Sequence, residues 1–241
     1  MALNSIDAKM LSKMFLAGAK NLEVKKEWIN ELNVFPVPDG DTGTNMTMTI
    51  MAAAKEVATM DDPDMATLCK AISSGSLRGA RGNSGVILSQ IFKGFYEELE
   101  SDSIADVSEL CDAFIRAYKT AYKSVARPVE GTLLTVAREG IENIRSQIGR
   151  NVLVPNLFSM YLAELRKSLA NTPEMLPVLK EAKVVDSGGY GYVLLIEGME
   201  KSLYGEKIVA RTAPKLQVKN INQSLFNENL YDDVNNYYKN L

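Results

Sequence analysis

Apolar residues recur at intervals of three and four along most of the chain, which is the spacing that places them on one face of a helix. No stretch alternates apolar and polar residues for long enough to predict a β-strand. The pattern therefore indicates about ten helical segments and an all-α fold. Clear examples cover residues 6–21, 23–32, 43–58, 106–125, 155–170 and 190–203.

Local signals suggest where some of these segments begin and end. Asn171–Glu174 has the composition of a helix start with proline in the first turn, and it predicts a short helix that ends near Ala182. Residues 184–189 are expected to be extended and then to turn. Aliphatic residues become scarce after Gly205. We therefore expect one domain over residues 1–205 and a linker or tail over residues 206–241 that leads towards an absent downstream domain.

The composition is that of an ordinary globular protein, with 46% hydrophobic and 24% charged residues over 241 positions. The formal net charge of −3 gives no reason to expect nucleic acid or an anionic membrane as a partner. No apolar run is long enough to span a bilayer and no signal peptide is recognisable, so a cytoplasmic location is expected. Cys69 and Cys111 occupy apolar helical positions and are predicted to be reduced core residues.

The chain contains no histidine. This excludes Ser-His and Cys-His nucleophiles, a histidine general base and histidine-ligated zinc. Any chemistry must depend on carboxylates, hydroxyls, backbone N–H groups, arginine and lysine.

The most informative segment is Asn33–Met46, with the sequence NVFPVPDGDTGTNM. Its prolines stop the preceding helix, and the glycine between Asp39 and Asp41 allows a turn in which both carboxylates converge. Carboxylates hold a hard cation such as Mg²⁺, and the helix that starts next offers free N–H groups to phosphates. Asp-Gly-Asp alone would be explained more simply as a capped turn, but the whole run is more specific.

Three other turns with glycine, hydroxyl or amide groups come directly before helices. In Gly79–Gly85 the last four residues favour an anion site, whereas the earlier glycines are also explained by close helix packing. The pattern is not a Walker A loop. Residues 130–132 and 186–189 are each explained as well by a helix cap when considered alone.

Residues 33–46, 78–90, 128–132 and 184–189, taken together and in this order, resemble the N-terminal kinase domain of bacterial fatty acid kinases. These belong to the dihydroxyacetone-kinase nucleotide-binding (DhaL-like) family, and the resemblance covers roughly residues 5–205. It implies an antiparallel barrel of eight helices that binds ATP at one end, with two Mg²⁺ ions between the phosphates and the acidic turn. Fatty acid kinases phosphorylate a fatty acid that a separate fatty-acid-binding protein presents, and the acyl phosphate serves phospholipid synthesis.

The resemblance implies roles for individual residues by position. Asp39 and Asp41 would be catalytic residues and Mg²⁺ ligands, with Asn33 as a further candidate ligand. Arg81 is a candidate for stabilising the transferred phosphoryl group, and pairing with a nearby acid is an equal alternative. The implied ATP/ADP contacts are Thr42, Gly43, Thr44, Asn45, Gly82, Asn83, Ser84, Gly131, Thr132, Asp186, Ser187 and Gly188.

The chain departs from dihydroxyacetone kinases at two positions. Asn33 lies nearest to the place of a third aspartate, and Thr42 stands where those kinases carry a histidine. Both differences favour a fatty acid over dihydroxyacetone. A carboxylate with a pKa of about 4–5 is already ionised at neutral pH, so its phosphorylation requires no general base, which suits a chain without histidine.

Other functions stay open from the sequence. One is a dihydroxyacetone-kinase-like phosphotransfer subunit, and another is a nucleotide-binding regulatory module without turnover of its own. A purely structural helical bundle would require all four turns to be simple caps. Because fatty acid kinases continue into further domains, the chain is expected to be an excised domain or a truncated relative. A homodimer of the full-length protein through those domains stays open as well.

Overall fold

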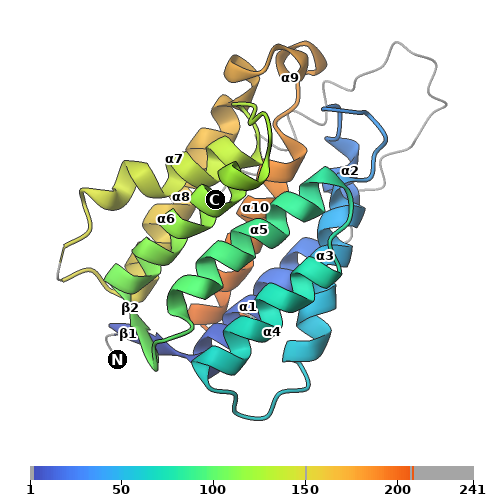
Figure 1. Ribbon diagram of the computed structural model, residues 1–241. Helices are drawn as coiled ribbons and strands as arrows, with labels where there is room; N and C mark the ends of the chain where they lie inside the picture. The colour runs from blue at the N-terminus through green and yellow to red at the C-terminus, as the bar shows by residue number, and fades with distance from the viewer. Residues whose placement is uncertain (1–2, 150, 207, 209–241) are drawn as a thin grey trace.

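The computed structural model describes residues 3–149, 151–206 and 208. Within these ranges the chain forms ten helices and two short strands (Figure 1). The helices are α1 (Ala8–Val24), α2 (Lys26–Glu31), α3 (Thr42–Val57), α4 (Met65–Arg78), α5 (Gly82–Leu99), α6 (Val107–Ser124), α7 (Leu133–Arg145), α8 (Val154–Met175), α9 (Pro177–Ala182) and α10 (Ser187–Leu203). Since α2 and α9 have only 6 residues each, eight long helices make up the body, and the predicted all-α fold is confirmed.

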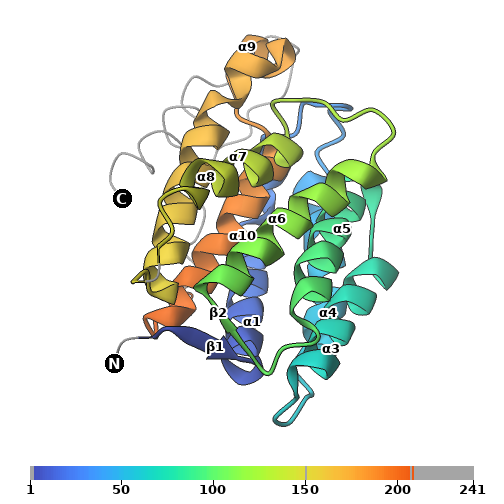
Figure 2. The ribbon, with the colours of Figure 1, turned by 60° about the vertical axis from the view of Figure 1, so that its left-hand side comes forward.

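The central element is α10, which lies between α1 and α8 in both views (Figures 1 and 2). Every residue from Ser187 to Met199 is buried, as expected for a helix with neighbours on all sides. Glycines allow α1 to approach it closely. A Cβ on Gly18 would lie 2.8 Å from the carbonyl oxygen of Leu195, and one on Gly198 would lie 2.6 Å from that of Ala17. Larger residues at these two positions would force the helices apart.

The strands are β1 (Ser5–Asp7) and β2 (Ile104–Asp106), which pair antiparallel with Ile6 opposite Ala105. The expectation of no strands was wrong in this detail, because three residues are too few to show an alternating pattern. Each strand ends on an aspartate that caps the next helix. Asp7 accepts the N–H of Met10 at 2.8 Å, and Asp106 forms a capping box with Glu109.

The prediction that a new helix begins at Asn171 is wrong. Helix α8 continues to Met175 with Pro173 inside it, and α9 starts at Pro177. Pro173 has no N–H group to donate to the carbonyl oxygen of Leu169, four residues earlier. The hydroxyl of Thr172 donates to that oxygen instead, at 2.7 Å, so the helix continues past the proline.

Cys69 and Cys111 are buried free thiols, as predicted, and burial raises the pKa of both to about 12. No helix in the described ranges is long and apolar enough to cross a membrane. The predicted tail over residues 206–241 falls, apart from Glu206 and Ile208, outside the described residues.

Candidate functional site

The predicted motifs meet at one end of the molecule, at the top in Figure 1, where α3, α5, α7 and α10 begin. The hydroxyl of Ser187 donates to that of Thr42 at 3.3 Å, which joins the starts of α10 and α3. The side chain of Asn45 lies against Gly82, where a Cβ would overlap the Asn45 amide nitrogen. The acidic turn, the glycine-rich turn and the 186–189 turn are therefore neighbours in space, although 145 residues separate Thr42 from Ser187.

Asp186 connects three helices at this end. Its carboxylate accepts the N–H of Gly189 at 2.7 Å and also the N–H of Leu133, so it bonds to the first turns of α10 and α7. Its own N–H donates to the hydroxyl of Thr172 in α8 at 3.1 Å. The residue is only 5% exposed. This burial raises the pKa of Asp186 to about 6, against the opposing effect of the two N–H groups.

Replacing Asp186 by asparagine should change how stability depends on pH. The pKa of this carboxyl is 3.8 ordinarily and about 6 in the folded protein, so the folded state binds the proton more tightly. The free energy of unfolding should therefore fall by about 3 kcal/mol in total as pH rises, with most of the fall between about pH 4 and about pH 7. Asparagine keeps the cap but cannot ionise. Urea unfolding across this pH range should show the fall in the wild type only, and parallel profiles would contradict the assignment.

Asn33 fixes the shape of the acidic turn. It is 6% exposed, and its side-chain oxygen accepts the N–H groups of Asp41 and Thr42 at 3.1 and 3.3 Å. Its amide nitrogen donates to the carbonyl oxygen of Val37 at 3.0 Å. The role of Asn33 as a metal ligand stays a prediction, and it would compete with these two accepted hydrogen bonds.

Asn30 of α2 has a similar function that the sequence did not suggest. Its side-chain oxygen accepts the N–H of Thr44 at 3.0 Å, and its amide nitrogen donates to the Thr44 hydroxyl at 3.1 Å. The only available signal was its position one helical turn before Asn33. Asn30 and Asn33 thus both hold the start of α3 through their side chains.

The carboxylates of Asp39 and Asp41 remain available. Both residues are exposed, and neither side chain has a hydrogen bond or ion pair with any residue that the structure describes. Gly40 between them has φ +67°, the left-handed conformation that the turn requires. Over the same described ranges, no group of three or more His, Cys, Asp or Glu residues could hold a metal. A cation here would need oxygen ligands beyond the two carboxylates, such as water or phosphate.

Helix α3 offers few free N–H groups to an anion. The N–H groups of Thr42 and Thr44 are bound by the asparagines, and that of Asn45 donates to the carbonyl oxygen of Asp41 at 2.8 Å. In the first turn, only the N–H of Gly43 lacks a partner among the described residues. The predicted phosphate contacts of α3 are therefore limited mainly to this one N–H and to side chains.

Helix α5 offers more free N–H groups to an anion than α3 does. Arg81 precedes it without a side-chain cap, and the N–H groups of Gly82, Asn83 and Ser84 have no partner within the part of the chain described. The guanidinium of Arg81 is exposed and makes no ion pair with a described residue, so the alternative of pairing with a nearby acid is not observed. The strongest concentration of unused donors thus lies at the start of α5, at the same end of the molecule as the unused carboxylates.

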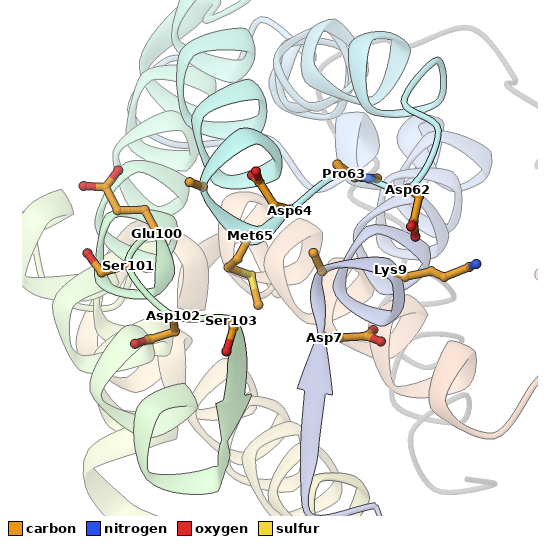
Figure 3. A pocket seen from close by; sticks show the side chains of 12 residues that line it. Asp7, Lys9, Asp62, Pro63, Asp64, Met65, Glu100, Ser101, Asp102 and Ser103 are labelled. Carbon is orange, nitrogen blue, oxygen red and sulfur yellow. The ribbon is translucent and has the colours of Figure 1, made fainter.

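A cavity of about 510 Å³ lies at the opposite end of the molecule, beside the strands and the α3–α4 and α5–α6 turns (Figure 3). None of the predicted site residues lines it. Among its acidic residues, Asp7 and Asp64 already cap α1 and α4. The cavity is therefore separate from the candidate site.

Residues 36–201 match the DAK2 domain, and the chain belongs to this family. It is 44% identical over 208 residues to Protein YloV of Bacillus subtilis, which covers 86% of this chain and 38% of that protein. It is 43% identical over 217 residues to an uncharacterised protein of Staphylococcus epidermidis, covering 90% of this chain and 39% of that protein. The chain spans about two fifths of the length of these curated relatives.

The fold is similar to part of dihydroxyacetone kinase from C. freundii. The structure of that enzyme in complex with AMP-PNP and Mg²⁺ gives a TM-score of 0.60 at 17% identity, over 84% of this chain and 35% of that chain. Its native form gives a TM-score of 0.56 at 18% identity, over 84% and 36%. These matches confirm the DhaL-like helical fold. The closer resemblance to fatty acid kinases stays a prediction.

Proposed function

We propose that the domain binds Mg·ATP at the end where α3, α5, α7 and α10 begin. In this proposal it transfers the γ-phosphoryl group to the carboxylate of a fatty acid that a separate fatty-acid-binding protein presents. The observation that carries the proposal is the pair of unengaged carboxylates, Asp39 and Asp41, at the same end of the molecule as the unpaired N–H groups at the start of α5, where Gly82 lies against Asn45. Membership of the DAK2 family supports it, as does the fold shared with a kinase whose structure holds AMP-PNP and Mg²⁺.

The residues present fit these ligands. Asp39 and Asp41 would hold Mg²⁺, which supplies neutralisation of phosphate charge. The N–H groups of Gly82, Asn83 and Ser84 would bind phosphate oxygens, and Arg81 would stabilise the transferred group. The starts of α7 and α10 would border the rest of the nucleotide.

The proposed reaction balances without a proton acceptor. A carboxylate oxygen of the fatty acid forms a bond to the γ-phosphorus, and the bond from that phosphorus to the β,γ-bridging oxygen breaks. ADP leaves with the electron pair, and an acyl phosphate results. Because the carboxylate is ionised at neutral pH, no side chain has to remove a proton, which suits a chain without histidine.

A second candidate is a regulatory module that binds nucleotide without turnover. The observation in its favour is that the matched region makes up only 38–39% of the length of these relatives, and this candidate assigns turnover to the parts of those proteins outside the match. The two candidates share the binding site and differ in the reaction.

Titration with Mg·ADP tests the binding step, because a ligand of the folded state must raise the melting temperature. Gly82→Ala is expected to weaken binding about tenfold, since the added Cβ would overlap Asn45 and shift the start of α5. Gly205→Ala is the matched control. Its glycine also has positive φ, +69° against +57° at Gly82, but no atom lies within 4 Å of the added Cβ. Equal affinities for the two variants would contradict the placement of the phosphates.

Turnover separates the two candidates. The chain is mixed with Mg·ATP, a fatty acid and the fatty-acid-binding protein, and ADP and acyl phosphate are measured. Formation of both products supports the kinase. Binding of Mg·ADP without products supports the regulatory module, and the absence of any binding at saturating ligand would overturn both.

A further inference from the structure

The turn before α7, residues 128–132, is held from two sides. On one side the N–H of Gly131 donates to the hydroxyl of Thr135 at 2.9 Å. On the other side a Cβ at Gly131 would lie 3.1 Å from the carbonyl oxygen of Thr172, whose hydroxyl accepts the N–H of Asp186. Gly131 also has φ +81°, which a side chain would disfavour. Both this backbone conformation and the close approach to α8 therefore depend on glycine. The position of the turn is thus coupled to that of Asp186 through Thr172.

Glu130 is the centre of a polar network on the α7 side of this turn. One carboxylate oxygen accepts the hydroxyl of Thr135 at 2.6 Å and the guanidinium of Arg138 at 2.8 Å. The other accepts the hydroxyl of Tyr122 at 3.0 Å. Partial burial opposes ionisation, but these hydrogen bonds lower the pKa of Glu130, so the carboxylate is charged at neutral pH.

Arg138 joins this network to α6. Its Nε donates to the hydroxyl of Tyr122 at 3.2 Å, and the centre of its guanidinium lies 6.0 Å from the centroid of the Tyr122 ring. A single side chain on the second turn of α7 therefore contacts both α6 and Glu130 of the turn. The planar guanidinium suits this double contact better than an ammonium group would.

We propose that Arg138 is a positioning residue for the nucleotide: it holds Glu130 between Tyr122 and Thr135, and thereby fixes Gly131 and Thr132 at the mouth of the site. The inference rests on the proposed function, because it takes the 128–132 turn as a border of the nucleotide site. Arg138 was not among the predicted contacts, and it acts through the turn.

The network is suited to placing the turn more than to stabilising the fold. The side chain of Arg138 is 31% exposed and that of Glu130 is 53% exposed. Exposed ion pairs contribute little to the free energy of unfolding, because water competes for both partners. Loss of Arg138 should therefore appear mainly in the local opening of the turn and in nucleotide affinity.

The test compares Arg138→Met with Arg116→Met. Arg116 lies on α6 and pairs with Glu98 at 2.8 Å and Glu97 at 3.4 Å, so its loss also removes exposed ion pairs but leaves the turn intact. Calorimetric titration with Mg·ADP should show about tenfold weaker binding for Arg138→Met and a change below about twofold for Arg116→Met. Arg138→Lys should recover only part of the affinity, because an ammonium group cannot reproduce the double contact.

Two further measurements distinguish positioning from general destabilisation. Amide hydrogen exchange without nucleotide should accelerate in residues 128–135 of Arg138→Met while exchange in α5 stays unchanged. Adding Glu130→Gln to Arg138→Met should cost little further affinity, because the two residues act in one chain of contacts. Wild-type affinity in Arg138→Met, or equal losses in both arginine variants, would overturn the inference. Failure of the wild type to bind Mg·ADP would instead overturn the proposed function, and unchanged exchange in residues 128–135 would still refute the positioning role.

Discussion

Replacing Asp41 by asparagine is expected to reduce acyl phosphate formation on the order of 10²- to 10³-fold, the loss typical of removing one group that stabilises transition-state charge. The substitution keeps the size of the side chain and the backbone N–H that donates to Asn33, so the turn should keep its shape. It removes one of two carboxylates that have no partner in the described structure and that would hold Mg²⁺. Initial rates at several Mg²⁺ concentrations measure the effect, and higher Mg²⁺ should restore part of the rate.

The matched control for this prediction is Asp61→Asn. Asp61 is an exposed residue of the α3–α4 turn at the other end of the molecule, so the change in net charge is the same. Its rate should stay within about twofold of the wild type, because surface charges at this distance are screened by salt. Equal rates for Asp41→Asn and Asp61→Asn would remove the metal assignment. If the chain binds nucleotide without turnover, the same comparison applies to the Mg²⁺ dependence of ADP binding.

Replacing Gly43 by alanine is expected to cause the largest loss of stability among single methyl additions in the site. The new Cβ would overlap the carbonyl oxygen of Lys26 and lie 2.9 Å from the Cβ of Ile29, so α2 and α3 would have to separate. Such overpacking costs about 3 kcal/mol. For a domain of this size, that corresponds to a fall in melting temperature on the order of 10 °C. Calorimetry or circular dichroism measures the change.

Gly149→Ala provides the comparison for Gly43→Ala. No atom lies within 4 Å of a Cβ at position 149, so alanine should be neutral or slightly stabilising there. A melting temperature for Gly43→Ala within about 2 °C of the control would show that α2 can move away at little cost. In that case α2 would be a weakly attached element.

The helices could be predicted from the sequence because apolar spacing reflects burial directly. The four motifs could be identified because turn residues and helix starts are local features. Two errors have local physical causes. The strands were missed because three residues show no period, and the break at Asn171 was wrong because the Thr172 hydroxyl replaces the donor that Pro173 lacks.

The supporting residues of the site could not be predicted in the same way. Asn30 and Arg138 act on residues 14 and 8 positions away, on separate turns, and apart from the position of Asn30 one helical turn before Asn33, nothing in their own neighbourhood marks them. Which helix keeps free N–H groups for an anion also depends on tertiary contacts. Asn30 and Asn33 accept N–H groups at the start of α3, whereas the first N–H groups of α5 stay free.

The central position of α10 has a consequence for how the domain would respond to a ligand. Its amides from Tyr190 to Met199 lie inside the helix on buried residues, so we expect them to exchange with solvent only when the whole domain unfolds. The first turn of the same helix borders the candidate site. A ligand at that turn would therefore slow exchange deep inside the protein by the factor 1 + [L]/Kd, and the slowest amides would report occupancy of a site on the surface.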